Sequence, residues 1–432
     1  MTTPPGAISV APIPRHLLPD NAEISAEGHM SVGGVDLVEL AQEYGTPLFV
    51  YDEEHLRARC REAVEVFGTG VAYATKAFLC VAMAKLAHEE GMHLDVATLG
   101  ELHVAEVAGV PASDLVFHGN NKSTVELQAA MQASVGRIVI DSFDEIERIE
   151  AIHADTGLVA RALLRITPGV EAHTHEFIAT GQDDSKFGFT VSTGLADQAI
   201  TKATASSAIE LLGIHAHIGS QVFRIDSMRQ SGEVLAEISQ RYALPELSVG
   251  GGLGVAYVGH EEAPTISQWG RSVLEATGQA GIDAHVLAEP GRSIVATAGM
   301  TIYQVGTVKQ LEGIRTYVAV DGGMSDNPRP VLYGSGYEAF VPDRADAERA
   351  RQVRVVGKHC ESGDIIIRDA RVPADLAVGD FLVTPVTGAY GHSLASNYNK
   401  VTRPAVVFVR NGHARLVVRR ETLNDLVSHD VI

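Results

Sequence analysis

The stretch LLGIHAHIGS at residues 211–220 is a short apolar run that ends in histidine, glycine and serine. A run of this length, closed by a polar or glycine-containing cluster, is typical of a buried strand. Seven similar runs lie between residues 71 and 294: VAYATK (71–76), HLDVAT (93–98), LVFHGN (115–120), RIVIDS (137–142), ALLRIT (162–167), ELSVGGG (246–252) and AHVLAEPG (284–291). The sequence therefore predicts eight buried strands.

The segments between these strands predict helices. Isoleucines recur every three residues over 146–152, as on the buried face of a helix. Ser123 precedes Glu126 by three residues, and Ser142 precedes Glu145 in the same way. This is the capping-box spacing that satisfies free N–H groups at a helix start. Alternating strands and helices favour a parallel (β/α)8 barrel, with a doubly wound open sheet as the main alternative.

Residues of unusual chemistry gather toward the carboxyl ends of the eight predicted strands. They are Lys76, Asp95, His118, Asp141, Arg165, His217, Gly250 and Glu289. In a barrel these strand ends converge on one mouth, where the active sites of the fold lie. Their distribution therefore favours the barrel over the open sheet.

The pattern changes after about residue 300, where apolar residues alternate with polar ones and turn residues intervene. This period of two predicts antiparallel strands, and Asn411-Gly412 between two such runs is a strong hairpin signal. We therefore predict an α/β barrel over residues 45–305 plus an all-β domain. The second domain is expected to comprise residues 306–432, with residues 1–44 packing on it.

The composition and charge of the chain indicate which kinds of molecule it can bind. The 432 residues include 34 basic and 54 acidic ones, which gives a net charge of −20. Such a charge repels nucleic acid and anionic membrane surfaces, and the sequence contains no apolar run of about 18 residues that would span a membrane. Three scattered cysteines and a proline-rich start without a secretory pattern suit the cytoplasm. A small-molecule ligand is expected.

Three of the predicted strand ends together outline a site for pyridoxal phosphate. Lys76 offers an amine for a Schiff base, although a single lysine can also simply reach solvent. The glycines at 250–252 allow backbone N–H groups to surround a phosphate, although a glycine run alone is a weak signal. Glu289, next to Gly291 and Arg292, supplies a carboxylate for the pyridine nitrogen.

A metal site is the competing interpretation of the histidines. His215 and His217 lie on one face of a predicted strand, and His173 with His175 repeats the spacing. Metal-dependent barrel hydrolases use such pairs, but zinc and iron sites usually need a third protein ligand. Lysine and arginine at the other strand ends are unfavourable neighbours for a cation. We expect no metal, and a histidine that packs in the core or stacks on a flat cofactor.

The chain resembles the fold-type III pyridoxal phosphate decarboxylases, whose fold is like that of alanine racemase and ornithine decarboxylase. The resemblance extends from GTPLFVYD at 45 to NYNKVTRPA at 397–405. The matching segments are YATKAF (73–78), HGNNKS (118–123), THEFIATG (174–181), SKFGF (185–189), HAHIGSQ (215–221), GGGLG (250–254), EPGR (289–292), DGGMSDNPRPVLYG (321–334), CESGD (360–364) and GAYGHSLASNYN (388–399). Each is weak alone, but their common order is specific.

The resemblance implies a role for each cofactor-binding residue. Lys76 would hold the cofactor, His217 would stack on its ring, and Glu289 would pair with the ring nitrogen. Asp95 and Arg165 would support the barrel mouth. The residues around the phosphate would be Ser220, Gly250, Gly251, Gly252, Gly291, Arg292 and Tyr390.

The resemblance also implies how substrate is bound. Arg292, Arg329 and Tyr333 would hold a carboxylate far from the reacting centre, with Tyr390 nearby. Cys360 and Glu361 would reach into the site of a partner subunit, Cys360 near the reacting carbon and Glu361 at the far ammonium. A homodimer with shared active sites follows from this resemblance alone.

The implied reaction is decarboxylation of meso-2,6-diaminopimelate to L-lysine and CO2, the last step of lysine biosynthesis. Lys76 or Cys360 would return a proton to the reacting carbon. Two alternatives stay open: a pyridoxal phosphate decarboxylase of another basic or D-amino acid, and a non-catalytic homologue that only binds the cofactor.

Overall fold

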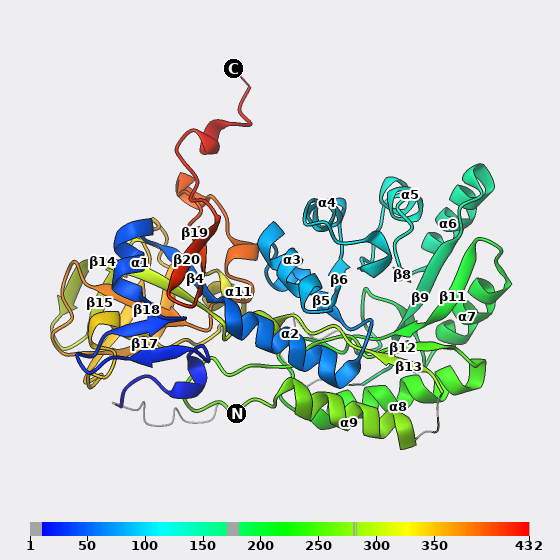
Figure 1. Ribbon diagram of the computed structural model, residues 1–432, viewed down its shortest axis with the longest axis horizontal. Coiled ribbons are helices and arrows are strands. Elements are labelled where there is room, and N and C mark those ends of the chain that lie inside the picture. The colour runs from blue at the N-terminus through cyan, green and yellow to red at the C-terminus, as the bar shows by residue number, and fades with distance from the viewer. Residues whose placement is uncertain (1–10, 171–180, 280, 282, 432) are drawn as a thin grey trace. The chain divides into compact units, whose positions relative to one another are not determined.

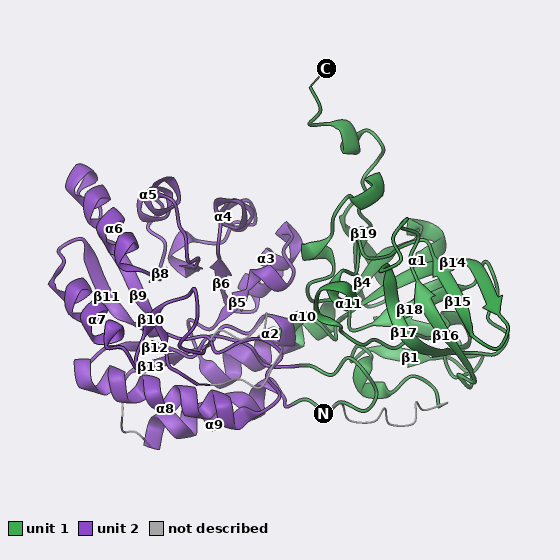
Figure 2. Ribbon diagram, turned by 180° about the vertical axis from the view of Figure 1, so that it is seen from behind, with its two compact units in different colours: residues 1–58, 255–263, 294–432 green, residues 59–254, 264–293 purple. Residues whose placement is uncertain are grey.

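The computed structural model describes residues 11–170, 181–279, 281 and 283–431 (Figure 1). These residues form two compact units, each built from separate stretches of chain and coloured separately in Figure 2. Unit 1 contains the described residues up to 58, together with 255–263 and 294–431. Unit 2 contains the described residues of 59–254 and 264–293.

Unit 2 is the predicted barrel. Eight of its strands pair in parallel and in chain order: β5 (Ala72–Ala74), β6 (His93–Val96), β7 (Leu115–Phe117), β8 (Arg137–Ile140), β9 (Ala160–Thr167), β11 (Ile209–His215), β12 (Glu246–Ser248) and β13 (His285–Leu287). A ninth strand of two residues, β10 (Phe189–Thr190), pairs with β9 outside this order. The first strand also meets the end of the last, since Ala72 N donates to Ala288 O at 2.9 Å and Ala74 N to Pro290 O at 3.1 Å. The nearly closed barrel is confirmed, and the open sheet is excluded.

Helices follow the barrel strands, and their apolar faces are buried. They are α3 (Val81–Glu89), α4 (Leu99–Val107), α5 (Thr124–Gln132), α6 (Phe143–Thr156), α7 (Leu195–Ala205), α8 (Ile225–Tyr242) and α9 (Ile266–Gln279). Ile146 and Ile149 of α6 are fully buried, as their spacing predicted. Helices α8 and α9 lie side by side (Figure 1). One residue from each of five strands forms a cluster in the core: Ala72, Val116, Val139, Leu163 and Leu212.

A buried ion pair joins two elements of unit 2. Lys122 Nζ lies 2.8 Å from Glu145 Oε1, and both side chains are only 1% exposed. The ammonium also donates to the carbonyl oxygens of Gly119 and Val139, each at 2.6 Å. Glu145 accepts from the N–H of Asp141 with its other oxygen. The carboxylate of Glu145 therefore links Lys122 to the end of β8.

Of the two predicted capping boxes, one is complete in the structure and the other is half formed. At the start of α5, Ser123 and Glu126 form the complete reciprocal pair. At the start of α6, Ser142 accepts from the N–H of Glu145, but the Glu145 side chain contacts Lys122 and the N–H of Asp141. The second box is half formed because the buried ion pair uses its carboxylate.

Unit 1 contains an eight-stranded sheet in the order β17-β16-β15-β14-β4-β19-β20, with β18 paired to β14. The strands are β4 (Leu48–Asp52), β14 (Gly299–Leu311), β15 (Arg315–Val320), β16 (Arg351–Val356), β17 (Ile365–Val372), β18 (Phe381–Pro385), β19 (Ala405–Arg410) and β20 (His413–Val418). A small sheet of β1 (Ala22–Ile24), β2 (Met30–Val32) and β3 (Val35–Asp36) precedes helix α1 (Leu37–Tyr44).

The sheet of unit 1 is mixed, which corrects the purely antiparallel prediction. β15 pairs with β16 in parallel, and so does β4 with β19. Parallel neighbours need a long connection, and residues 321–350 supply one between β15 and β16. The Asn411-Gly412 hairpin between β19 and β20 is confirmed, with φ of 52° and 75° at the two turn residues. Both values suit the hairpin turn that this dipeptide favours.

The units differ from the predicted range of 45–305 at both ends. β4 belongs to unit 1 because it pairs with β14 and β19. The stretch 255–263 also belongs to unit 1. Helix α2 (Glu53–Phe67) begins in unit 1 and ends in unit 2. The transition between units is therefore not one cut in the sequence, since strand pairing brings distant stretches together.

Among the described residues, no helix has both the length and the apolar character needed to cross a membrane.

Replacing Lys122 with methionine should destabilise the barrel strongly. The substitution leaves the Glu145 carboxylate buried without its cation, which typically costs about 3–5 kcal/mol. Urea unfolding followed by circular dichroism measures the change. The matched control is Lys202→Met, because the Lys202–Glu147 pair is 35% and 65% exposed and such pairs contribute about 0–1 kcal/mol. Equal losses in the two variants would contradict the prediction.

Candidate active site

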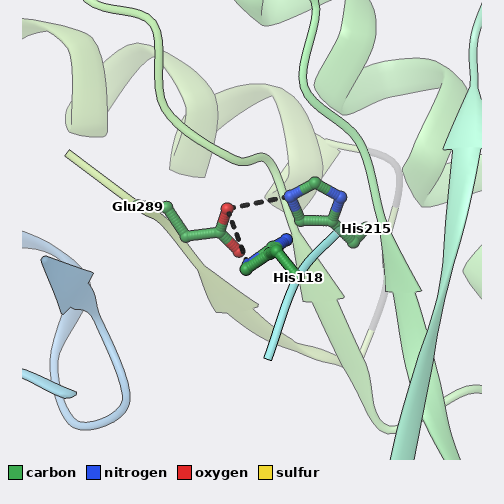
Figure 3. Close-up of side chains that lie close together, drawn as sticks. All are labelled: His118, His215 and Glu289. Atoms are coloured by element: carbon green, nitrogen blue, oxygen red, sulfur yellow. Dashed lines mark hydrogen bonds and ion pairs between the residues drawn. The ribbon is translucent and has the colours of Figure 1, made fainter. Parts of the chain in front are cut away.

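A buried carboxylate, Glu289, lies at the end of the last barrel strand (Figure 3). Ser248 Oγ donates to Glu289 Oε1 at 2.7 Å. The ring nitrogen Nε2 of His215 lies 2.8 Å from Glu289 Oε2. His118 Nε2 lies 3.6 Å from the same oxygen. The barrel thus gathers the ends of β7, β11, β12 and β13 around one acidic group.

The charge of this cluster resides on Glu289. Burial alone would raise the pKa of Glu289, but His215, His118 and the hydrogen bonds from His215 and Ser248 lower it overall. Burial lowers the pKa of His118 well below its usual value. Burial and the charge of Glu289 raise the pKa of Asp95 well above its usual value. Glu289 is therefore ionised and His118 is neutral, whereas Asp95 binds a proton more tightly than an ordinary aspartate does.

The loops after β11, β12 and β13 form the glycine-rich part of the site. A Cβ atom at Gly251 would collide with the carbonyl oxygen of Glu289, and one at Gly252 with that of Gly219. Only glycine allows this close approach of backbones, so the loop presents main-chain groups. Arg292 is buried nearby and donates from Nη2 to Ser220 Oγ at 2.7 Å.

His217 lies beside this loop. Its Nδ1 accepts from the N–H of Gly251 at 3.3 Å. Burial, followed by the charges of Lys76 and Arg165, lowers the pKa of His217 well below its usual value. A neutral, half-buried ring at the barrel mouth is suited to stacking on a flat ligand.

Lys76 lies in the short helical turn after β5 (Thr75–Ala77). Its side chain is exposed, while Thr75 and Ala77 on either side are buried. The sequence left open whether this side chain reaches solvent, and in the structure it does. Its charge nevertheless acts on Asp95 and His217. Lys76 is therefore an accessible amine at the same mouth.

The other predicted supporting residues are also at the strand ends. Arg165 Nη1 lies 3.9 Å from Asp141 Oδ2, and its guanidinium lies 4.1 Å over the ring of Phe187. Asp141 Oδ1 accepts from the N–H of Gly188 at 2.6 Å. Asp95 lies 3.6 Å from His118, measured from Oδ1 to Nε2. Unit 2 thus brings together its predicted site residues.

These residues fit pyridoxal phosphate. The mouth offers an accessible amine on Lys76, a buried anion on Glu289 and a glycine loop beside the Arg292–Ser220 pair. They match an aldehyde, a pyridine nitrogen and a phosphate in turn. The oxygen Oδ1 of Asp95 and the Nε2 of His118 are buried without a hydrogen bond among the described residues. A polar ligand would satisfy such atoms.

The histidine pair of the metal interpretation is divided between two neighbours. His215 contacts Glu289, whereas His217 contacts the N–H of Gly251. His173 and His175 lie outside the described residues, as does most of the THEFIATG segment. The atoms of His118, His215 and Glu289 that are able to bind a cation lie within 4.8 Å of one another. This trio differs from the pair that the spacing suggested.

Unit 1 contains a buried arginine with aromatic neighbours. Arg329 begins helix α11 (Arg329–Tyr333) and is 4% exposed. Its guanidinium lies 4.0 Å over the ring of Tyr257, and Nη1 donates to the hydroxyl of Tyr337 at 2.7 Å. Burial by itself would lower the pKa of Arg329, but Tyr257, Tyr337 and Tyr390 raise it overall. No ion pair among the described residues includes Arg329.

The loop that carries Cys360 and Glu361 is held by its neighbours in unit 1. Cys360 and Glu361 are exposed. His359 is buried, its Nε2 lies 2.8 Å from Ser325 Oγ, and its Nδ1 lies 3.1 Å from Asn399 Oδ1. The same Asn399 oxygen accepts from the N–H of Cys360 at 3.3 Å. The exposed thiol and carboxylate therefore project from a fixed backbone.

Tyr333 and Tyr390, the remaining predicted residues of unit 1, are half-buried. Tyr333 ends helix α11, four residues after Arg329. Tyr390 has a φ of 59°, in the left-handed region. Its effect on the pKa of Arg329 places it in the same neighbourhood.

Five contributors to the two clusters were not predicted as cofactor-binding, substrate-binding or catalytic residues. Three of them, His118, His215 and Ser248, lie at or directly after the ends of β7, β11 and β12, so position at a strand end was an available signal. Tyr257 and Tyr337 gave no such signal. Tyr257 lies in the stretch 255–263, and only the fold places it against Arg329.

Comparison with known proteins defines the class. The family model described as the pyridoxal binding domain of pyridoxal-dependent decarboxylases matches residues 53–296. Together with the barrel and its mouth, this defines a pyridoxal phosphate decarboxylase.

The chain belongs to the diaminopimelate decarboxylase family. It is 45% identical to the diaminopimelate decarboxylase of Mycobacterium tuberculosis, covering 96% of this chain and 97% of that protein. It is also 45% identical to that of Bacillus subtilis, covering 94% and 95%. The structure of the M. jannaschii diaminopimelate decarboxylase in complex with L-lysine matches with a TM-score of 0.89 at 31% identity, over 96% of this chain and 98% of that one.

The pH dependence of stability should report a buried carboxyl in unit 1. Tyr303 donates to Asp326 Oδ1 at 2.5 Å, and the N–H of Gly323 donates to Oδ2 at 2.7 Å. Burial is the main cause that raises the pKa of Asp326 to about 7, from an ordinary 3.8. The folded protein therefore binds this proton more tightly than the unfolded chain, and the stabilisation is present in acid and lost as pH rises through 7.

Asp326→Asn should remove this dependence, because the amide does not titrate. We expect the melting temperature of the original protein to fall relative to that of the variant between pH 5 and pH 8. The control is Asp369→Asn, at an exposed position of β17. A constant difference between Asp326→Asn and the original protein across this range would contradict the prediction.

Proposed function

We propose that the protein removes the carboxyl group at the D centre of meso-2,6-diaminopimelate, which gives L-lysine and CO2. The relatives that cover nearly the whole chain carry the name of this activity, and a solved relative binds L-lysine. The observation that carries the proposal is Arg329. A buried guanidinium without an acidic partner among the described residues is costly. A second carboxylate on the substrate would offset that cost.

The roles in unit 2 follow from the positions of its residues. Bound pyridoxal phosphate supplies an aldehyde for amines and a ring that takes up the electron pair of a broken C–C bond. Lys76 holds this group through Nζ, and the neutral ring of His217 packs on it. The Gly250–Gly252 loop, Ser220 and Arg292 bind the phosphate, with Gly291 allowing the chain to turn beside Ala74. Glu289 pairs with the ring nitrogen.

Decarboxylation then requires orientation and one proton. The residues of the mouth would orient the substrate on the bound cofactor, whose ring would take up the electron pair left when CO2 departs. Lys76 or Cys360 delivers the proton that takes its place on the carbon. Because the pKa of Glu289 is lowered while that of Asp95 is raised, the carboxylate of Glu289 is the dominant anion of the cluster.

Substrate selection depends on charge at the far end of the molecule. Arg329 binds the distal carboxylate with two parallel hydrogen bonds, for which a guanidinium is suited. The family resemblance assigns Tyr333, Tyr390 and Arg292 to the same end of the substrate, and Glu361 to the distal ammonium. An amino acid without the second carboxylate would leave Arg329 unpaired.

We also propose a homodimer in which Cys360 and Glu361 serve the partner's site. Their exposure on a loop fixed by His359 and Asn399 supports this assignment. A cytoplasmic location accompanies the proposed biosynthetic role. Sedimentation in solution tests the dimer, and a monomer at working concentration would exclude it.

Lys76→Ala should abolish both the visible absorbance of the bound cofactor and CO2 release from diaminopimelate. The amine is the attachment point, and alanine offers no replacement. Absorption spectra and counted CO2 provide the two measurements. Lys85→Ala is the matched control, since Lys85 is 65% exposed and its ion pair with Glu89 is 3.9 Å long. Turnover retained by Lys76→Ala would refute the assignment.

Arg329→Ala should lower kcat/KM for diaminopimelate by roughly 10⁴-fold, because a site built for one polar group loses its partner. Activity toward L-lysine and L-ornithine, which lack the distal carboxylate, should change far less. A panel of amino acids with CO2 detection measures the difference. Arg368→Ala, at an exposed position of β17, is the control. A uniform loss across the panel would show that Arg329 does not select the substrate.

A further inference from the structure

The hydrogen bonds that Glu289 accepts offset the cost of its burial and also affect its strength as a base. Ser248 donates to one carboxylate oxygen and His215 to the other, at 2.7 Å and 2.8 Å. An ionised carboxylate only accepts hydrogen bonds, so the Nε2 of His215 must carry the hydrogen. His215 and Ser248 are buried, with 1% and 0% of each residue exposed. Water therefore does not replace either donor.

The register of the barrel fixes these contacts. His215 and Ser248 are direct partners in the pairing of β11 with β12. Ser248 is in turn the partner of Leu287 in β13, and Glu289 follows Leu287 by two residues. Residues two apart in an extended chain share a face. The three side chains therefore meet because of strand register rather than through a flexible loop.

His118 holds the ring of His215 without adding a second bond. The two rings pack edge to face, with centroids 5.0 Å apart and an interplanar angle of 65°. The 3.6 Å distance from His118 Nε2 to Glu289 Oε2 exceeds that of a hydrogen bond. His215 is therefore the only ring that donates to Glu289 among the described residues.

A donor to a carboxylate makes that carboxylate a weaker base, because it stabilises the charged form. This matters where a carboxylate shares a proton with a pyridine nitrogen. A stronger base would draw the proton onto oxygen and leave the ring neutral. A weaker base leaves the proton on nitrogen and the ring positively charged, which suits a ring that must accept electrons.

We propose that His215 is a positioning residue that weakens Glu289 as a base, so that the ring nitrogen of bound pyridoxal phosphate keeps its proton. Ser248 acts in the same direction from the other oxygen. This inference rests on the proposed pairing of Glu289 with the ring nitrogen, and it assigns to His215 the function of setting where the proton resides.

The experiment observes the nitrogen directly. The holoenzyme is loaded with pyridoxal phosphate labelled with ¹⁵N in the ring, and the nitrogen chemical shift is compared in the original protein, His215→Leu and His215→Gln. We expect a protonated nitrogen in the original protein and a shift toward the unprotonated value in His215→Leu. His215→Gln retains an N–H donor and should restore the original shift.

Activity provides the second measurement. His215→Leu should lower kcat with little change in KM for diaminopimelate, since each unit by which the pKa of Glu289 rises moves the ratio of nitrogen-bound to oxygen-bound proton about tenfold toward oxygen. His215→Gln should recover most of kcat, which a purely structural role of the imidazole would not predict. His103→Leu, in which a histidine 75% exposed on α4 is replaced, is the control.

Ser248→Ala keeps the test decisive if His215→Leu does not fold, because it removes the other donor with a smaller change of volume. It should move the nitrogen shift in the same direction. An unchanged nitrogen shift in a folded, cofactor-loaded His215→Leu or Ser248→Ala protein would overturn the inference. The proposed function fails separately, if the original protein binds the cofactor but releases no CO2 from diaminopimelate.

Discussion

One buried negative charge, on Glu289, sets the conditions for the whole barrel mouth. A carboxylate removed from water needs donors in place, and the barrel supplies them from neighbouring strands in register. Burial and the negative charge of Glu289 raise the pKa of Asp95 well above its usual value. The neutral rings of His118 and His217 follow from the same burial. The site thus concentrates its negative charge on Glu289, at the mouth that also carries the accessible Lys76.

The sequence was sufficient for the barrel because its signals are local. Each strand is an apolar run with a polar end, and each helix follows within a short distance. Pairing between distant stretches is not local, and this is where prediction was wrong. Nothing in LFVYD (48–52) shows that it pairs with β14 and β19 in unit 1. The sequence also gave no indication that β15 pairs with β16 in parallel.

Some residues of the candidate site could likewise be predicted from the sequence, and others could not. Lys76, Glu289 and the glycine loop were identifiable because position at a strand end restricts what a residue can contact. The accessibility of Lys76 was left open by the sequence, since it depends on the short turn after β5. The partners of Arg329 come from residues 257 and 337, far apart along the chain. A side chain that acts on a site only by contacting another side chain produces no recognisable sequence pattern.

The division of unit 1 into three stretches has a consequence during synthesis. The ribosome releases β4 early, with Leu48, Phe49, Val50 and Tyr51 all destined for complete burial. Its partners β14 and β19 emerge only after the barrel has been made. For that interval the nascent chain displays an unpaired apolar strand, which is prone to aggregate. Early folding of the intervening barrel shortens the stretch of unfolded chain between β4 and its later partners. We expect chaperones to act mainly on β4 during this interval.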